Sequence, residues 1–403
     1  MSQGLNRLKV RCLQKAQQKP TRRRSVSGGK FHSQMKAGRL ALGKTTAVKK
    51  KILLVDLGAP MGGVEHYIEI LSGMLRDRAT LVSLCVLPEL ALRLRGLGVK
   101  VFLIPAFARF KALRFLLALG VLPIIILRER VQIVQVNGLL ESILLIPARL
   151  LGREAIYTRH GPFEDDLYKW YESPARYFPR LTARLCVRLA SHVICVSHDV
   201  GKCVRKVVPE ERTSVIPLWM PCMPPYSASK GELRLPVNLL YVGRLERYKG
   251  LYLLLEALRG VPDVRLTVVG DGSYRKELEG LAEGMDVRFE GFQPHPGKYY
   301  ADADIFVMPS LGPEGFGIVT MEAMAHGVPC ITSDLEVHRE VTGDGTAAML
   351  FRNGSVEDLR GKLQELISNA SLRSFYSAAG YQRVEKAYSS DTALRSYLWA
   401  FGL

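Results

Sequence analysis

The stretch FVMPSLGPEGFGIVTMEAMAHGVPCITSD, residues 306–334, contains a complete strand–loop–helix–strand unit. An apolar run at 304–310 predicts a buried strand, and a loop rich in Gly and Pro follows it. Apolar residues at helical spacing then predict a helix over 316–326, and a second apolar run at 329–334 predicts the next strand. Strands that are apolar on both faces and joined through helices form parallel sheets covered by helices on both sides.

The same alternation extends from this stretch in both directions. The alternation is interrupted once: residues 219–236 hold four prolines and show no apolar periodicity, which indicates a linker between two halves of the chain. The sequence therefore predicts two doubly wound, Rossmann-like α/β domains at 51–218 and 237–390 that face a central cleft, followed by a closing helix at 391–403. The other predicted strands are 52–57, 80–87, 99–105, 131–137, 154–160, 192–197, 213–218, 237–243, 264–270, 287–292 and 347–351.

The excess positive charge is concentrated at the start of the chain. The 403 residues carry a formal charge of +18, and 15 of the 56 Lys and Arg residues lie in residues 1–51, which hold no Asp or Glu. The remainder carries only about +3, so a basic groove for nucleic acid is not indicated. Residues 1–50 lack apolar periodicity, and we expect a basic disordered tail there.

One apolar segment and two basic, aromatic segments bear on membrane binding. The run at 115–127 has 13 residues and contains Pro123, whereas a membrane-spanning helix needs about 20. We therefore expect a core helix leading into a strand. Cations alternate with aromatic residues before this run and again at 168–188, which is typical of a solvated basic helix face or of a patch that binds an anionic membrane surface. These residues are Arg109, Phe110, Lys111, Arg114, Phe115, Tyr168, Trp170, Tyr171, Tyr177, Phe178, Arg180, Arg184 and Arg188.

In open parallel sheets, ligands bind at the carboxyl ends of the strands. Gly62 and Gly63 follow the first predicted strand, where glycine lets backbone N–H groups approach an anion closely; a plain tight turn is the alternative. Arg244 and Lys249 follow the first strand of the second half. A guanidinium and an ammonium five residues apart at a strand end suit a diphosphate.

Glu314 and Glu322 are eight residues apart, and on a helical path they would lie roughly 12 Å from each other. A glycosidase needs its two carboxyl groups less than about 10 Å apart, so these two are poor partners for cleaving one bond. They suit hydroxyl pairs at opposite ends of a long ligand, with an anion between them at the helix start. The N–H groups there belong to Phe316, Gly317 and Ile318, and the combination fits a nucleoside diphosphate sugar.

Further polar residues end the strands of the first half. His160 precedes Gly-Pro at the end of one strand, which favours a place in the cleft over a core histidine. Asn137 and Ser197 end neighbouring strands and are candidates for binding the acceptor. Asp302 and Asp304 form an Asp-x-Asp pattern that can hold a metal, but a helix-to-strand connector is the favoured interpretation.

These motifs together resemble the retaining glycosyltransferases of family 4, which have the GT-B fold. The resemblance covers about residues 52–390. It rests on GGVEHY (62–67), TRHGP (158–162), VSH (196–198), VGRLERYKG (242–250), VVGDG (268–272) and EGFGIVTME (314–322), which looks like that family's Glu-x7-Glu signature.

The resemblance implies a role for each motif. Glu314 would hold sugar hydroxyls, Glu322 the ribose, and Arg244 and Lys249 the diphosphate as charge develops on the leaving group. Gly63 would add a backbone N–H, His160 would contact the sugar near the reacting carbon, and Phe292 would lie near the base. No cofactor and no metal are implied, and the donor, linked to UDP or GDP, is a substrate.

The resemblance leaves the acceptor open between a glycan and a polyprenyl-linked intermediate. The expected activity is hexosyl transfer with retention in exopolysaccharide or lipopolysaccharide assembly, in the cytoplasm or peripherally at the inner face of the cell membrane, without a nucleic-acid partner. Two alternatives remain at this point: a nucleotide-sugar epimerase of the same fold, and a non-catalytic membrane-associated GT-B module.

Overall fold

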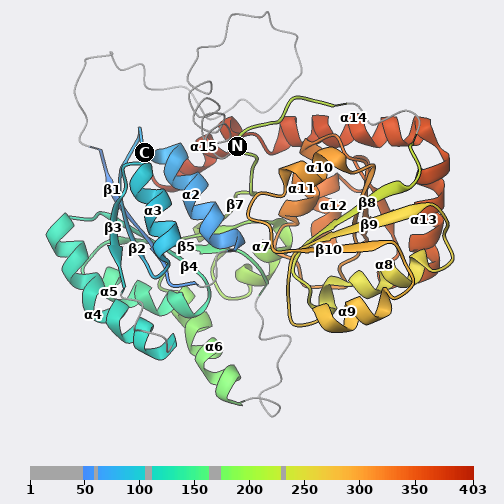
Figure 1. The fold of residues 1–403 in the computed structure, drawn as a ribbon. Helices are drawn as coiled ribbons and strands as arrows, with labels where there is room; N and C mark the ends of the chain where they lie inside the picture. Colours follow the sequence, from blue (N-terminus) through green and yellow to red (C-terminus); the bar gives the residue numbers. More distant parts are fainter. Residues whose placement is uncertain (1–48, 59–61, 105–110, 163–173, 228–232) are drawn as a thin grey trace, which may run out of the picture.

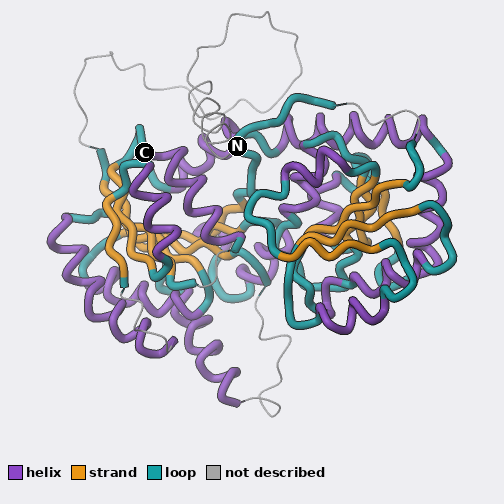
Figure 2. The backbone as a smooth tube through the Cα atoms, in the orientation of Figure 1, coloured by secondary structure: helices purple, strands orange, loops and turns teal. Residues whose placement is uncertain are grey.

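The computed structural model describes residues 49–58, 62–104, 111–162, 174–227 and 233–403, without the side chains of 111–112 and 174–180. Two parallel sheets lie side by side, each flanked by helices on both faces (Figures 1 and 2). Most of the predicted tail, Arg109 and Phe110, and Tyr168, Trp170 and Tyr171 lie outside the described residues. The side chains of Lys111, Tyr177, Phe178 and Arg180 are likewise outside this description.

The first sheet has the strand order β3-β2-β1-β4-β5-β6-β7, and its neighbouring strands run parallel. Its central strands β1 and β4 are buried except for Lys51, because helices cover both faces of the sheet and most residues of these strands are apolar. The strands are β1 (Lys51–Asp56), β2 (Thr80–Cys85), β3 (Lys100–Leu103), β4 (Ile133–Asn137), β5 (Glu154–Arg159), β6 (His192–Cys195) and β7 (Thr213–Val215). The helices are α2 (Gly63–Leu75), α3 (Pro88–Gly96), α4 (Lys111–Glu129), η1 (Leu140–Leu144), α5 (Leu145–Leu150), α6 (Pro174–Val187), α7 (His198–Arg205) and η3 (Glu210–Arg212).

The second sheet has the order β10-β9-β8-β11-β12-β13 and is also parallel. Its strands are β8 (Val237–Val242), β9 (Val264–Val269), β10 (Val287–Gly291), β11 (Ile305–Met308), β12 (Cys330–Ser333) and β13 (Met349–Phe351). Its helices are η4 (Arg247–Lys249), α8 (Leu251–Leu258), α9 (Arg275–Leu281), α10 (Gly297–Asp302), α11 (Ile318–Ala325), α12 (Glu336–Thr342), α13 (Val356–Ser368) and α14 (Ala370–Ala387). The two doubly wound domains confirm the predicted fold class.

Each sheet has one topological switch point, where the strand order reverses direction. It lies between β1 and β4 in the first sheet and between β8 and β11 in the second. Helices that follow these strand pairs leave on opposite faces, which opens a crevice at the carboxyl ends of the two strands. The switch points therefore indicate where ligands bind.

The last helix, α15 (Ser390–Ala400), packs on the first domain although it follows the second in sequence (Figure 1). Its Tyr397 is fully buried against Trp219 and Tyr67, with ring centroids 5.2 and 6.2 Å apart. The backbone N–H of Met220 donates to the carbonyl of Tyr388 at 2.9 Å. The segment predicted as a linker thus runs beside the returning chain, and the two domains are joined twice.

Two local predictions are wrong. The apolar run at 115–127 does not turn into a strand: α4 continues to Glu129 with Pro123 inside it. The helix predicted over 316–326 begins only at Ile318, because Gly317 has a left-handed φ of 83° and ends the preceding loop. Among the described residues, no helix is both long and apolar enough to cross a membrane.

Candidate functional site

A buried ion pair lies at the switch point of the second sheet. Lys249, in the loop after β8, donates through Nζ to Glu314 Oε1 at 2.6 Å, and Ser310 Oγ donates to the same oxygen at 2.5 Å. Glu314 follows β11, so two neighbouring strand ends supply the two charges. The Glu314 residue is 8% exposed, and the Lys249 side chain 12%.

The surroundings of Glu314 favour its charged form. Burial by itself would raise the pKa of Glu314, but the nearby charge of Lys249, together with His338 and the hydrogen bonds from Lys249 and Ser310, lowers this pKa overall. The carboxylate therefore stays ionised at neutral pH and can accept hydrogen bonds from hydroxyl groups. Sequence reasoning identified Glu314 and Lys249, and it missed Ser310 and His338, which carry no recognisable motif.

Tyr248 joins the two predicted cations. Its ring lies 5.8 Å from the guanidinium of Arg244 and 5.5 Å from Lys249 Nζ, and its hydroxyl accepts a hydrogen bond from Arg244 Nη2. Arg244 is exposed, whereas Lys249 lies deeper. Two cations beside one aromatic ring give a positively charged surface that suits a diphosphate. Sequence reasoning missed Tyr248, which lies inside the motif that it used.

The loop that carries Lys249 is held against the loop after β11. Gly250 has φ of 69°, and a Cβ at this position would lie 1.9 Å from the carbonyl oxygen of Pro309. The backbone N–H of Leu311 donates to the carbonyl of Tyr248 at 2.8 Å. The ion pair is therefore fixed by backbone contacts between its two loops, and only glycine fits at position 250.

Helix α11 begins directly after these loops. Gly317 is its N-cap, Ile318 its first residue, and His338 Cδ2 would lie 3.5 Å from a Cβ on Gly317. Phe316 is 2% exposed, and its ring packs edge-on against Tyr388 at 5.3 Å. The start of a helix favours an anion. The predicted backbone donors thus lie at this helix start, while the Phe316 ring is part of the core.

Glu322 lies one turn from the end of α11. Its Oε2 accepts a hydrogen bond from the hydroxyl of Tyr300 at 2.9 Å. Burial raises the pKa of Glu322 overall, and this hydrogen bond and the charge of His66 offset the rise only in part. His66 belongs to α2 of the first domain, so the two domains meet near Glu322. The assumption of a continuous helix from Glu314 to Glu322 fails, since Glu314 lies in the loop.

His160 and Asn137 form the polar pair of the first domain. Asn137 ends β4, is 1% exposed, and donates through Nδ2 to the carbonyl of Val55 at 3.3 Å. Its Oδ1 therefore faces His160 Nε2, 3.0 Å away, and this places the proton on Nε2 and leaves Nδ1 as an acceptor. Burial, assisted by the charge of Arg159, lowers the pKa of His160 to about 3, so the ring is neutral.

The first and second domains touch where these two sites meet. A Cβ on Gly315 would lie 1.9 Å from the carbonyl oxygen of His160, so glycine is required next to Glu314. Away from this contact, the N–H of His198 donates to Glu340 Oε2 at 2.8 Å, and Lys202 pairs with Glu336. The structure thus brings His160 beside the loop that carries Glu314, across the domain boundary.

The remaining predicted site residues follow strand ends, and their contacts do not assign them a role. Gly62 and Gly63 are exposed at the start of α2, and the N–H of Gly62 donates to Glu65 Oε2 at 2.8 Å. Ser197 is fully buried and caps α7 by accepting from the N–H of Val200 at 3.2 Å. Phe292 follows β10 and is 61% exposed. Both Ser197 and Asn137 have protein partners, and the acceptor role predicted for them stays a prediction.

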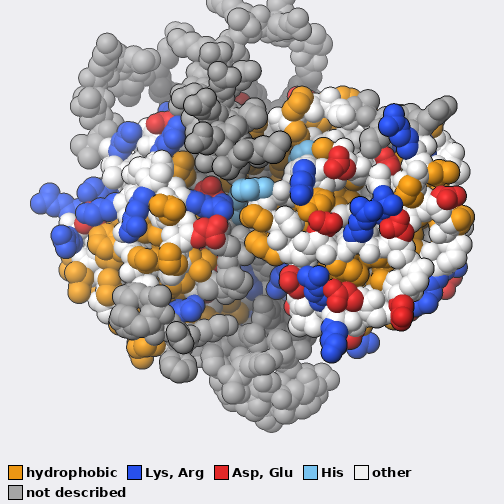
Figure 3. Space-filling model, in the orientation of Figure 1, with side chains coloured by type: hydrophobic (Ala, Val, Ile, Leu, Met, Phe, Trp, Pro, Cys, Tyr) orange, Lys and Arg blue, Asp and Glu red, His pale blue; other side chains and the backbone are white. Residues whose placement is uncertain are grey.

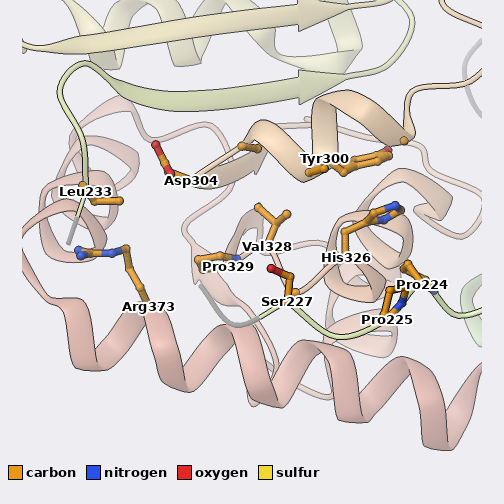
Figure 4. Close-up of a pocket in the computed structure, with 14 residues that line it drawn as sticks. Pro224, Pro225, Ser227, Leu233, Tyr300, Asp304, His326, Val328, Pro329 and Arg373 are labelled. Carbon is orange, nitrogen blue, oxygen red and sulfur yellow. The ribbon is translucent and has the colours of Figure 1, made fainter. Parts of the chain in front are cut away.

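One cavity of about 320 Å³ lies between the linker, α10 and the loop that joins α11 to β12 (Figure 4). Tyr300 and His326 line it, and their rings stack at 5.1 Å. The Asp304 residue on its wall is 5% exposed and accepts the backbone N–H of Asn238 at 2.9 Å, at the amino end of β11. Asp302 and Asp304 therefore lie at the amino ends of the strands, whereas Lys249 and Glu314 lie at the carboxyl ends. Among the described residues, no three His, Cys, Asp or Glu cluster as metal ligands would.

Comparisons with known proteins agree with this geometry. A family model described as Glycosyltransferase Family 4 matches residues 61–220, and one described as Glycosyl transferases group 1 matches residues 230–383. Each model corresponds to one of the two domains, and the boundary between them falls at the linker.

Characterised relatives align over about two fifths of the chain. A phosphatidyl-myo-inositol mannosyltransferase of Mycobacterium leprae is 40% identical over 166 residues, which is 39% of this chain and 44% of the relative. A sulfoquinovosyl transferase of Arabidopsis thaliana is 33% identical over 39% of this chain and 32% of its own length. The matched stretches thus span less than half the length of these relatives.

Solved structures match over nearly the whole described chain. The Anabaena protein HepE in complex with UDP and glucose superposes with a TM-score of 0.71 at 20% identity and covers 88% of this chain and 99% of its own. A lipopolysaccharide outer core galactosyltransferase, WaaB, has a TM-score of 0.68 at 18% identity, with 88% and 99% coverage. At this identity the likeness establishes the GT-B fold. With one family model matching each domain, the chain belongs to the family 4 and group 1 glycosyltransferases of GT-B fold.

Proposed function

We propose that this protein transfers a hexose, with retention of configuration, from a nucleoside diphosphate sugar to a lipid-linked or glycan acceptor. The observation that carries the proposal is the buried Lys249–Glu314 pair beside the start of α11. Glu314 Oε1 is taken by Lys249 and Ser310, which leaves Oε2 to accept hydrogen bonds from hydroxyl groups of the donor sugar. Lys249 and Arg244 then face the diphosphate.

The proposed chemistry needs charge stabilisation more than proton transfer from the protein. As the bond between the anomeric carbon and the diphosphate oxygen breaks, negative charge grows on the leaving group, where Lys249, Arg244 and the N–H groups of α11 stabilise it. The acceptor oxygen bonds to the same face of that carbon, and its proton passes to the departing phosphate oxygen. Both atoms and charge then balance without a protein base.

His160 would take a neutral part in this reaction. Its low pKa keeps the ring uncharged, and Asn137 fixes the proton on Nε2, so that Nδ1 accepts a hydrogen bond. Its position beside Gly315 supports a contact with the donor sugar close to Glu314. At the other end of α11, Glu322 would accept the ribose hydroxyls while Tyr300 holds its carboxylate.

The acceptor class rests on what similar proteins are called. The matched relatives are named for phosphatidyl-myo-inositol mannosylation, sulfoquinovosyl transfer and, in Rhizobium meliloti, lipopolysaccharide core biosynthesis. These names favour an acceptor attached to a lipid or to a lipid-linked glycan. Assembly of a cell-surface polysaccharide or glycolipid is the corresponding biological role.

The test is transfer of label from radioactive UDP- and GDP-hexoses into the lipid or glycan fraction of a membrane extract. We expect incorporation with one donor, and loss of incorporation in Glu314→Gln, which keeps the size of the side chain but removes its charge. Arg247→Gln is the matched control, because Arg247 is an exposed cation on the same turn as Lys249. Isomerised donor in the absence of acceptor, or no donor turnover, would contradict the proposal.

A further inference from the structure

Four polar side chains lie in a row inside the second domain. Ser310, Ser333 and His338 are fully buried, and they lead from helix α12 to Glu314. Figure 3 shows where the charged side chains of this domain are usually found: Lys, Arg, Asp and Glu are spread over its surface, where water solvates them. Burial of a polar side chain costs free energy unless hydrogen bonds replace the lost water. These four side chains therefore call for an explanation that surface residues do not need.

Hydrogen bonds join the four side chains end to end. Ser310 Oγ donates to Glu314 Oε1 at 2.5 Å, and Ser333 Oγ donates to the backbone carbonyl of Ser310. His338 Nδ1 lies 2.9 Å from the carbonyl oxygen of Ser333 and 3.1 Å from its Oγ. The bonds connect three segments, which are α12, the end of β12 and the loop after β11. We call these residues the Glu314 network, defined by Glu314, Ser310, Ser333 and His338.

The partners of His338 fix the position of its proton. A carbonyl oxygen can only accept a hydrogen bond, so Nδ1 carries the hydrogen that is donated to Ser333. Nε2 is then the bare nitrogen, and it is buried without a hydrogen-bond partner among the described residues. Burial lowers the pKa of His338, although the charge of Glu314 opposes the shift, so the ring is neutral. A neutral ring with its proton on Nδ1 can donate only toward Ser333.

The same ring packs against the start of α11. A Cβ on Gly317, the N-cap of this helix, would lie 3.5 Å from His338 Cδ2. The backbone carbonyl of His338 is held separately, by the hydroxyl of Thr342 at 2.7 Å. His338 thus lies between the two parts of the donor site, because its network leads to Glu314 and its ring edge contacts the helix start.

The bare Nε2 argues against a purely stabilising role for His338. An acceptor that is buried without a partner costs stability, and an apolar side chain of similar size would not carry that cost. The hydrogen bonds of the Glu314 network run instead toward the carboxylate to which the proposed function assigns the sugar hydroxyls. Lys249 and Ser310 both bind Oε1 of Glu314, so their positions decide where Oε2 points.

We propose that His338 is a positioning residue for Glu314, and that it acts through Ser333 and Ser310 to hold the carboxylate with Oε2 toward the donor sugar. This inference rests on the proposed function for the identity of the ligand. Lys249 supplies the charge that keeps Glu314 ionised, and the Glu314 network supplies the orientation. A misdirected carboxylate still attracts a hydroxyl group but no longer holds the reacting carbon in place, so kcat suffers more than the KM of the donor.

The experiment compares His338→Asn with His338→Gln in the full-length protein. The amide nitrogen of Asn can take the place of Nδ1 and donate to Ser333, whereas the amide of Gln reaches the place of Nε2. Positioning predicts that the Asn variant keeps kcat within about threefold of wild type, while the Gln variant loses about 10-fold. Space filling alone predicts the reverse order, because Asn leaves the larger void.

Two further variants cover the case in which a substitution at 338 prevents folding. Ser333→Ala leaves the ring in place and breaks the next link of the Glu314 network, so kcat should fall about 10-fold with little change in the KM of the donor. Thr342→Val is the matched control, because it removes a buried hydrogen bond on the same helix and leaves the network complete. It should lose stability with kcat within about twofold of wild type.

Three outcomes would overturn the proposal. They are a Gln variant as active as the Asn variant, an unchanged kcat in Ser333→Ala, and an equal loss of kcat in Thr342→Val and Ser333→Ala. Binding of UDP and GDP, measured by calorimetry, should be equal in the Asn and Gln variants, because Glu314 is assigned to the sugar and not to the nucleotide. A difference in that binding would instead place the effect of His338 at the helix start.

Nitrogen NMR of protein with isotope-labelled histidine separates this inference from the proposed function. The signals of His338, identified by their loss in His338→Asn, should show a protonated Nδ1 and a bare Nε2. This spectrum in a protein that turns over no nucleotide sugar would refute the transferase proposal and leave the Glu314 network intact. Donor turnover with the proton on Nε2 would refute the network and leave the transferase.

Discussion

The two switch points of this molecule have the same topology and opposite chemistry. The second domain places charges there: Lys249 and Glu314 form a buried ion pair, and Arg244 donates a hydrogen bond to the hydroxyl of Tyr248. In the first domain, Asn137 ends β4 at the switch point, and its amide bonds to His160, which follows the next strand, β5, and has a pKa near 3. The contrast supports the proposal that one domain would hold the charged part of the donor while the other positions neutral groups around it.

The charged side of this comparison is tested by Lys249→Met, for which we expect the largest effect. Removal of the ammonium leaves Glu314 buried without its cation and the leaving diphosphate without its nearest charge, so kcat should fall about 10³-fold. Steady-state turnover of the labelled donor measures the loss. Arg247→Met, on the same turn, should stay within about twofold of wild type, and equal losses in both variants would refute the role of Lys249.

The neutral side is tested by Asn137→Ala. This substitution leaves His160 free to place its proton on either nitrogen, and loss of one buried hydrogen-bond partner should lower kcat about 10-fold with little change in the KM of the donor. Ser355→Ala is the control, since it removes the side-chain cap of α13, outside the site, and should cost about 1 kcal/mol of stability without changing kcat. A change confined to the KM of the acceptor would instead support a direct acceptor contact of Asn137.

A smaller kinetic effect is expected at Glu322, near which the two domains meet. Tyr300→Phe removes the hydrogen bond to Glu322 but keeps the ring, and the KM of the nucleotide sugar should rise about fivefold with kcat unchanged. Tyr299→Phe removes a comparable but exposed hydrogen bond to Glu290 and should have no kinetic effect. If both variants behave alike, Tyr300 does not position Glu322.

The smallest expected effect concerns stability and pH in the first domain. Burial, with the charge of Glu65 added, raises the pKa of Asp56 at the end of β1 from 3.8 to about 7. The unfolded chain releases this proton near pH 4 and the folded protein only near pH 7, so Asp56 costs stability as pH rises through that window. Asp56→Asn should therefore melt about 3 °C higher than wild type at pH 8 and no higher at pH 4. Equal melting temperatures at both pH values would contradict the shift.

The sequence predicted the strands well because the signal for a buried parallel strand is local. Runs such as 237–243 and 264–270 are rich in apolar and β-branched residues, and the observed β8 and β9 lie within them. The same local reasoning failed at Pro123, which lies inside α4. Proline usually ends a helix because it removes one backbone donor, and here the packing of α4 on the sheet outweighs that cost.

Within the site, residue type and spacing identified the charged groups but not the residues that hydrogen-bond to them or pack against them. Glu314 and Lys249 were predicted because each follows a strand end that the strand pattern already located. Ser310, Tyr248 and Tyr300 were missed, since Ser and Tyr at such positions are common and only their contacts distinguish them. Asn137 was predicted to bind the acceptor, and that role stays a prediction; its contact with His160 could not be seen in the sequence.

The sequence by itself determined two doubly wound domains and the strand ends that bear charge, because apolar runs and strand-end residues are properties of short segments. Only the tertiary structure decided that Glu314 meets Lys249, that His160 lies against Gly315 of the other domain, and that α4 shows leucines to the outside. These facts depend on which segments become neighbours. Neighbours are chosen when burial of apolar surface and backbone fit are satisfied over the whole chain at once.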